Sequence, residues 1–443
     1  MTLSGTFGSL RQQGRSKSAT ALFSNLGIYR LCIFVAVLDF LDITDFFEAN
    51  TLTKYLYGAI IIGFMAVYFL RWKTIELRAA PVMFLLFFVV TGVAFMLRFV
   101  IYDERNSYIS AFISPLVFSL SIFIPANTIA VDARKIAKTL TILFSVGTAF
   151  YLVEAIVKPL GLLGGGAYNG LYNGSYEVQL LKSMNCVLAL CLSILLGQKK
   201  LGLAIGAATA ATIILRPTST LVLALICCVP IAIMLRHRVE KYTPVAVIIS
   251  RAIAMSILFL VVSIPLLLYF YFDDIAAFIT DIEGYLKSDV IGGRSNMAFR
   301  LAILKFAFTG IDNTSFLYGS ALSGSQTVSL GQLRAWQWWF NLDPNGEAPI
   351  HSDFVIVFIL MGILGYIVFS GAFYLVLRNR FGALAQPGVQ GGGVVLLAIS
   401  IVACLALLIY SSGQPYLAYY SHTNIVWMLL LISELVRKSK VLG

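Results

Sequence analysis

Three arginines and one histidine have the chemistry that a reaction at a phosphate group needs. Arg216 lies in a very short turn between two apolar runs, and His351 begins a later apolar run. Arg294 and Arg300 fall between them, in the longest connection of the chain. A guanidinium pairs with two phosphate oxygens at once and keeps its proton, whereas a neutral imidazole accepts a proton near neutral pH. These residue types predict an anion clamp combined with a general base.

Each of these residues also has a plainer interpretation. Arg216 could extend its side chain to lipid headgroups, and His351 could cap a helix or contact headgroups. Arg294 and Arg300 are six residues apart on a predicted helix, so they point in different directions and one of them is expected to be structural. Arg294 is the better candidate for binding an anion, because it follows two glycines at the predicted helix start, where backbone N–H groups also favour negative charge.

Ser352 and a group of tryptophans are candidate substrate contacts. Ser352 follows His351 directly and places a hydroxyl next to the imidazole in the sequence. Three of the five tryptophans occur close together, at Trp336, Trp338 and Trp339. Their rings could stack on sugar rings or form an aromatic belt at the membrane interface, and both interpretations stay open.

Four acidic residues form the main rival site. They recur every three residues and would share roughly one face of a helix: Asp39, Asp42, Asp45 and Glu48. A solvated acidic face is one interpretation, and a set of catalytic carboxylates is the other. No other cluster of His, Asp or Glu has the spacing of metal ligands, so we expect neither a metal nor a cofactor.

The elements that position these residues are predicted to be membrane-spanning helices. Of the 443 residues, 59% are hydrophobic and only 12% are charged, and the mean hydropathy is +0.88. The apolar runs are continuous and do not alternate with period two, which excludes a β-barrel. The six cysteines all fall inside apolar runs and cannot staple an exported segment. The sequence therefore predicts an all-α integral membrane protein.

About twelve apolar runs are long enough to cross roughly 30 Å of hydrocarbon. They are 26–44, 54–70, 79–101, 108–124, 134–157, 177–196, 200–215, 219–235, 245–272, 351–377, 392–410 and 415–436. The long connection between the ninth and tenth runs is predicted to hold two amphipathic stretches, one that opens at Asp273 and one over Arg294–Phe308. The predicted organisation is a tail 1–25, nine helices within 26–272, a large loop 273–350, three helices within 351–436 and a tail 437–443.

The charge distribution predicts the orientation in the membrane. The net charge is +11, because 32 Lys and Arg outnumber 21 Asp and Glu. Most basic residues, Arg378 and Arg380 included, fall on the same side as the N-terminus, and positively charged connections stay cytoplasmic. Both termini are thus expected in the cytoplasm, with Arg216 and the loop 273–350 outside. Orientation and attraction to the membrane surface account for the positive charge, so we expect no nucleic-acid partner.

The order of these features resembles the O-antigen ligase/polymerase superfamily, a group of GT-C-like membrane glycosyltransferases. The resemblance rests on Arg216 in an outer turn, on the long outer loop 273–350, and on one local motif. In that motif His351-Ser352 is followed by nine residues and then by Gly362-Ile363-Leu364-Gly365. This is similar to the family pattern of His, a small polar residue, nine positions, Gly, two positions and Gly.

Two departures from the family leave its branch open. Met361 stands where many members carry a glutamate. The Arg-x10-Gly pattern of some polymerases does not follow Arg216, Arg294 or Arg300.

The resemblance implies a metal-independent, inverting glycosyl transfer on the periplasmic face of the bacterial inner membrane. The implied donor is an oligosaccharide on undecaprenyl pyrophosphate. Arg216 and Arg294 would stabilise the leaving pyrophosphate, and His351 would take the proton of the acceptor hydroxyl. Arg300, Ser352 and the three tryptophans would contact substrate. Membrane lipids surround such an enzyme, and chain-length regulator and flippase proteins are candidate partners.

Three functions remain as alternatives at this point. A polymerase joins lipid-linked repeat units to one another, and the sequence His-Ser-Asp-Phe at 351–354 resembles polymerases of the superfamily. A ligase transfers the finished glycan to lipid A-core, and the His-Ser…Gly-x-x-Gly pattern favours it. A lipid-linked oligosaccharide flippase or other secondary transporter is the third, and polymerase is the function that we expect.

Overall fold

The structure is a computed structural model, and it describes most of the helices predicted after residue 78. The described residues are 78–102, 118–119, 122, 133–157, 175–215, 219–241, 243–271, 274–275, 313–319, 328–329, 347–348, 352–386, 391–413 and 424–438. Within them the elements are α4 (Ala79–Tyr102), α6 (Ala133–Val157), α7 (Ser175–Leu195), α8 (Lys199–Leu215), α9 (Ser219–Glu240), α10 (Pro244–Phe270), α13 (Asn313–Tyr318), β1 (Val328–Ser329), β2 (Glu347–Ala348), α14 (Asp353–Leu384), α15 (Gly392–Gly413) and α16 (Asn424–Lys438).

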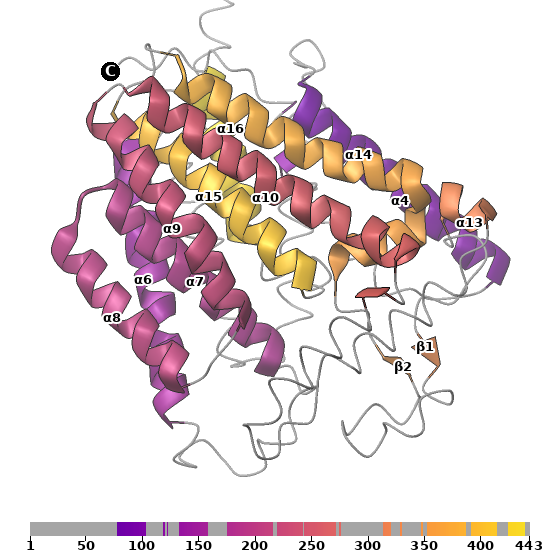
Figure 1. Cartoon of the computed structure of the whole chain (residues 1–443), viewed down its shortest axis with the longest axis horizontal. Coiled ribbons are helices and arrows are strands. Elements are labelled where there is room, and N and C mark those ends of the chain that lie inside the picture. Colours follow the sequence, from indigo (N-terminus) through magenta and orange to yellow (C-terminus); the bar gives the residue numbers. More distant parts are fainter. Residues whose placement is uncertain are drawn as a thin grey trace, which may run out of the picture.

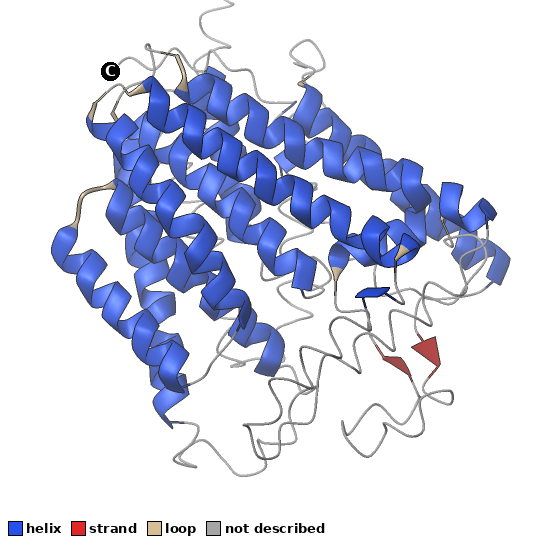
Figure 2. Cartoon of the chain, in the orientation of Figure 1, coloured by secondary structure: helices blue, strands red, loops and turns tan. Residues whose placement is uncertain are grey.

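The chain has the helices of an all-α, multi-pass membrane protein. Among the described residues, five stretches of helix are long and apolar enough to cross a membrane: Ala133–Val153, Ser219–Glu240, Pro244–Phe270, Asp353–Leu384 and Gly392–Ser412. The strands of the described residues are only two residues long, and they pair antiparallel with Val328 opposite Ala348 (Figure 2). This small pair and the short helix α13 lie within the segment 273–350 and were not predicted from the sequence.

Several predicted helices coincide with observed ones to within a few residues. The predictions 79–101, 134–157, 177–196, 200–215 and 245–272 correspond to α4, α6, α7, α8 and α10. The predicted helix 219–235 is five residues too short, because α9 continues to Glu240. The predicted helices 26–44 and 54–70, nearly all of 108–124, the first part of 415–436 and the amphipathic stretch Arg294–Phe308 lie outside the described residues.

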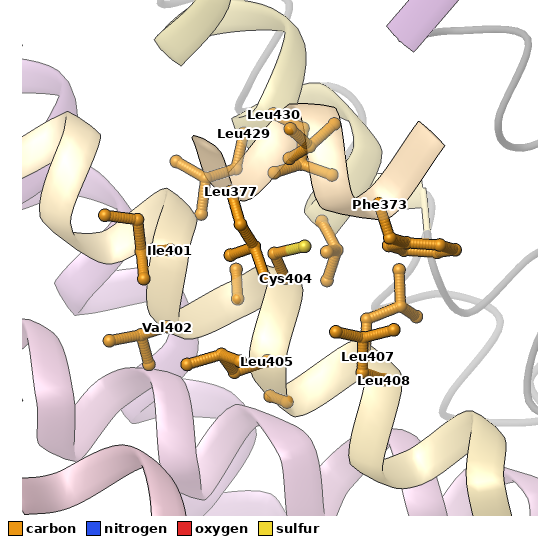
Figure 3. Packing of buried hydrophobic residues seen from close by; sticks show 14 of the residues in the cluster. Phe373, Leu377, Ile401, Val402, Cys404, Leu405, Leu407, Leu408, Leu429 and Leu430 are labelled. Carbon is orange, nitrogen blue, oxygen red and sulfur yellow. The ribbon is translucent and has the colours of Figure 1, made fainter. Parts of the chain in front are cut away.

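Helix α15 is the centre of the bundle. It contacts α6, α7, α9, α10, α14 and α16, and 94% of its most apolar window is buried, so it faces protein almost all round. Figure 3 shows Phe373 and Leu377 of α14 and Leu429 and Leu430 of α16 beside its residue Cys404. Helix α8, by contrast, lies at the edge of the bundle in Figure 1, and its buried residues are Ile205, Thr209 and Thr212. Its exposed side chains include Leu203, Ile214 and Leu215, which lipid can contact.

The connections predicted to be cytoplasmic gather at one end of the bundle. Helix α7 ends at Leu195 and is followed by Gly197, whose φ of 70° permits a tight turn; Gly197 lies close to Arg236, near the C-terminal end of α9. Arg238 donates to the carbonyl oxygens of Leu384 and Gln386, at 2.8 and 2.9 Å, and so caps the end of α14. Gly392 of α15 approaches the backbone of Arg134 too closely to carry a side chain. We call this the basic end.

A fully buried ion pair joins three helices near the basic end. The guanidinium of Arg380 in α14 lies 3.8 Å from the carboxylate of Glu434 in α16, and neither side chain is exposed. Arg380 also donates to the hydroxyls of Ser400 and Ser433, at 2.9 to 3.1 Å. The carbonyl oxygens of Val376 and Leu430 accept two further hydrogen bonds, at 3.2 and 2.8 Å. The positive charge of Arg380 can be buried here because its N–H groups have hydrogen-bond acceptors and a carboxylate lies nearby.

The predicted helix 351–377 corresponds to α14, but it ends seven residues too early, and the interruption within α14 was not predicted. Helix α14 continues to Leu384, so Arg378 and Arg380 belong to the helix and not to a connection. Gly362 interrupts it with φ 63° and ψ −171°, a conformation that favours glycine. The interruption divides α14 into a short arm, 353–361, and a long arm, 363–384.

Aromatic contacts show that the two arms lie against each other. The rings of Phe354 and Phe373 are 6.2 Å apart, although a continuous helix would separate these residues by about 28 Å. Phe354 also lies 5.4 Å from Phe369, and Phe358 lies 5.8 Å from Tyr366. These pairs are spaced almost symmetrically about residue 362. The short arm therefore folds back along the long arm, and we call the end of the bundle that holds Gly362 the hairpin end.

The buried ion pair should be essential for stability. Arg380→Met leaves the Glu434 carboxylate buried without its guanidinium, and we expect the free energy of unfolding to fall by about 3–5 kcal/mol. Arg378→Met changes an exposed arginine two residues away and should have little effect. The measurement is the free energy of unfolding of each purified variant in detergent. Equal stability of the two variants would contradict a structural role for the pair, and Arg380→Met/Glu434→Leu should regain part of the loss.

Candidate functional site

Ser352 is the one predicted site residue that lies within the described residues. The other candidates are outside them: Arg216, Arg294, Arg300, Trp336, Trp338, Trp339 and His351. The rival acidic group is outside them as well, at Asp39, Asp42, Asp45 and Glu48. The residues around Ser352 are therefore the described part of the candidate site.

Ser352 caps the short arm of α14 inside the protein. Its backbone is extended, and its hydroxyl accepts a hydrogen bond from the N–H of Val355 at 3.4 Å, as an N-cap residue does. The same hydroxyl donates to the carbonyl oxygen of Ser411 near the end of α15, also at 3.4 Å. Only 4% of Ser352 is exposed. Both bonds are long, so the hydroxyl is held loosely and can exchange partners.

The short arm is buried along its whole length. Every residue from Ser352 to Gly362 is buried, and seven of the nine residues between them are Phe, Val, Ile or Leu. A helix that is apolar on all sides needs protein or lipid around it, and here it lies among α15, α10 and the long arm. Ten residues of helix span about 15 Å, so Ser352 lies well below the turn at Gly362.

Further polar groups are buried at the start of the short arm and in the adjoining part of α15. Asp353 occupies the first turn of the short arm and is 97% buried, where the partial positive charge of the helix N-terminus stabilises a carboxylate. Tyr410, next to Ser411 in α15, shares a 2.8 Å hydrogen bond with Ser183 of α7. The hydroxyl of Ser411 is fully buried and makes no hydrogen bond. Such a group costs stability, so it is a candidate contact for a bound molecule.

The hydroxyls among these side chains can position a substrate, and the Asp353 carboxylate is the group among them that can accept a proton. Serine and tyrosine hydroxyls donate and accept hydrogen bonds, which suits sugar hydroxyls or phosphate oxygens. The second candidate base is His351, which is bonded to Ser352 on its N-terminal side. Within the described ranges, no three His, Cys, Asp or Glu residues are placed to hold a metal ion. A metal site thus has no candidate in this part of the chain.

The sequence alone did not indicate that Ser411 lies beside Ser352 or that the chain reverses at Gly362. Ser411 lies 59 residues after Ser352, within an apolar run that gives no functional signal. Gly362 was noted for its place in the motif, but a glycine in an apolar run does not predict a chain reversal. The ion pair of Arg380 and Glu434 was missed because both residues were assigned to the cytoplasmic side, near helix ends.

No protein-family model matches the chain, and no curated protein matches it significantly. The functional proposal therefore rests on the residues and their geometry.

Two serines that are equally buried should respond in opposite ways to removal of the hydroxyl. Ser411→Ala removes a hydroxyl without a hydrogen-bond partner, so we expect stability to stay the same or to rise by about 1 kcal/mol. Ser433→Ala removes an acceptor of Arg380, and we expect a loss of about 1.5–3 kcal/mol. Thermal unfolding in detergent distinguishes them. A destabilised Ser411→Ala protein would show that the hydroxyl has a structural partner and is not held for a ligand.

Proposed function

We propose that the chain is a glycosyltransferase of the bacterial inner membrane that polymerises oligosaccharide repeat units linked to undecaprenyl pyrophosphate. One observation carries the proposal. The nine residues between His351-Ser352 and Gly362 in the motif are the nine residues of the short arm. The motif spacing thus corresponds to one structural unit, a helix that starts at a buried serine and ends at a chain reversal.

The proposal places the site on the periplasmic side. Twelve helices would cross the membrane, with the tails 1–25 and 437–443 in the cytoplasm and the loop 273–350 in the periplasm. The gathering of Arg134, Arg236, Arg238 and Arg380 at the basic end supports a cytoplasmic basic end, since positive charge favours that side. The hairpin end, with Ser352 and Ser411, would then belong to the periplasmic half.

The proposed reaction is an inverting displacement at the anomeric carbon of the donor. The bond between that carbon and the pyrophosphate oxygen breaks while the acceptor hydroxyl forms the glycosidic bond, and undecaprenyl pyrophosphate leaves. Arg216 and Arg294 would stabilise the charge that builds on the leaving group. His351 would accept the proton of the acceptor hydroxyl. Ser352 and Arg300 would orient the substrate, and Trp336, Trp338 and Trp339 would stack on its sugar rings.

The nature of the acceptor separates polymerase from ligase. A polymerase uses another lipid-linked repeat unit as acceptor, whereas an O-antigen ligase uses lipid A-core. A buried, apolar short arm beside the site suits either acceptor, because both are lipid-anchored glycans. Incubation of the purified protein with the donor alone distinguishes them: a polymerase lengthens the glycan, and a ligase needs added lipid A-core.

A transporter of lipid-linked oligosaccharide is the second candidate function. The interruption of α14 at Gly362 favours it, because discontinuous helices at membrane depth are common in secondary transporters. Such proteins also show repeated halves, and this sequence has no convincing internal repeat. Formation of a glycosidic bond by the purified protein decides between the two, because a transporter moves its substrate unchanged.

His351→Ala and Arg216→Ala should impair the proposed reaction in different ways. Loss of the base should remove most product formation, by about 10²–10⁴-fold, while donor binding persists. Arg216→Ala should weaken donor binding as well as turnover, because a guanidinium on pyrophosphate acts in the ground state and in the transition state. Glycan formation and donor binding by the purified protein are the two measurements. Full activity of His351→Ala would exclude its role as a base.

The proposed reaction should not need a divalent metal. Product formation should survive an excess of EDTA, because arginines take the role that a metal has in other phosphate chemistry. The measurement is the rate of glycan formation before and after chelation, with added Mg²⁺ or Mn²⁺ as the control. Complete loss with EDTA and recovery with metal would move the proposed site to Asp39, Asp42 and Asp45.

A further inference from the structure

Helix α13 of the segment 273–350 is joined to the turn of α14 by a direct backbone contact. A side-chain carbon added at Gly362 would lie 2.5 Å from the backbone nitrogen of Gly319 and 2.5 Å from the carbonyl oxygen of Leu317. A carbon added at Gly319 would overlap the carbonyl group of Leu360. Both glycines also have positive φ, 86° at Gly319 and 63° at Gly362. Two strained backbone positions therefore meet where no side chain fits. We call this the glycine contact.

An aromatic cluster holds α13 in the same place. Phe316 of α13 lies 5.0 Å from Tyr269 and 6.2 Å from Phe270, at the end of α10. It also lies 5.7 Å from Phe358 of the short arm. Tyr269 and Phe358 are themselves 5.8 Å apart, so Phe316 completes a cluster of three rings. The edge-to-face and tilted geometry of these rings is favourable.

The long arm is attached independently to α10. Tyr366 donates its hydroxyl proton to the carbonyl oxygen of Val262 at 2.7 Å. Its ring lies 5.8 Å from Phe358 and 6.3 Å from Phe354 of the short arm. The short arm is thus enclosed by the long arm and α10, with α13 over the turn (Figure 1). Two long hydrogen bonds of Ser352 and apolar packing contribute to holding its inner end.

From this arrangement we infer that Gly319, Gly362 and Phe316 are positioning residues, which keep the short arm folded into the bundle and so set the place of Ser352. A chain reversal at membrane depth exposes backbone groups unless protein covers them, and α13 is the cover. The periplasmic segment and the short arm then move together. One consequence of the inference rests on the proposed function: α13 fixes the residue pair His351-Ser352 for the glycosyl transfer.

The accessibility of position 352 tests the inference without any assay of activity. In a Ser352→Cys protein the introduced thiol is expected to be buried, and a membrane-impermeant maleimide should react with it slowly. Adding Gly319→Ala should raise the labelling rate about tenfold or more, because labelling follows the population of the opened state. Peptide mass spectrometry assigns the label to position 352, so the native cysteines can stay. Tyr318→Cys, an exposed position in α13, shows that the reagent reaches this segment.

Matched variants separate positioning from general damage. Gly382→Ala adds a methyl group to the long arm where no atom lies within 4 Å, and it should leave the labelling at position 352 unchanged. Phe316→Ala should raise labelling as Gly319→Ala does, and Phe316→Leu should restore most of the protection, because it refills the apolar space. Under the proposed function, Gly319→Ala should lower kcat for glycan formation more than it changes KM for the donor, since the arginines that bind pyrophosphate are unaltered.

The outcomes distinguish this inference from the proposed function. Unchanged labelling at position 352 when Gly319→Ala or Phe316→Ala is added to the folded Ser352→Cys protein would overturn it, whatever the activity. Increased labelling with both substitutions, and none with Gly382→Ala, would support it. If labelling increases but the wild-type protein forms no glycosidic bond, the positioning role stands and the glycosyltransferase proposal fails.

Discussion

The close backbone contact between α13 and the turn at Gly362 shapes the hairpin end of this protein. A helix that stops in apolar surroundings releases N–H and carbonyl groups that protein must cover. In α14 the stop is at Gly362, and the cover comes from α13, α10 and the long arm of α14 itself. Because that cover exists, a helix of nine residues can lie buried with its N-cap residue, Ser352, in the interior. The candidate site depends on this arrangement.

The two ends of the bundle are built by different interactions. At the basic end, arginines satisfy buried carbonyls and carboxylates: Arg238 caps α14, and Arg380 joins α14, α15 and α16 through Ser400, Ser433 and Glu434. At the hairpin end, packing is aromatic and two hydroxyls lack strong partners: the hydrogen bonds of Ser352 are 3.4 Å long, and the hydroxyl of Ser411 makes none. A substrate bound beside these hydroxyls would supply the missing partners. The same groups would also suit the substrate of a transporter. Formation of a glycosidic bond must therefore distinguish a glycosyltransferase from a transporter.

The sequence predicted helix positions well and chain reversals poorly, for a physical reason. Apolar length determines where a helix forms in a membrane, so α4 and α6 match their predicted ranges. The run from Phe354 to Met361 is equally apolar in a straight helix and in a folded short arm, so hydropathy cannot tell them apart. Arg380 seemed to mark the end of a helix, because its partners Ser400 and Glu434 are distant in sequence. Of the predicted site residues, only Ser352 lies within the described part of the chain. The residues next to it in the sequence do not predict that it is buried in the protein interior.

The central claim is that the inner end of the short arm borders the binding site of a lipid-linked pyrophosphate. The most direct measurement is a cryo-electron microscopy map of the protein in lipid nanodiscs with undecaprenyl pyrophosphate bound. The account predicts density for the pyrophosphate at the hairpin end, within reach of Ser352 and Ser411, with the short arm folded back at Gly362. Pyrophosphate density at the basic end beside Arg380, or a straight α14 through Gly362, would contradict it.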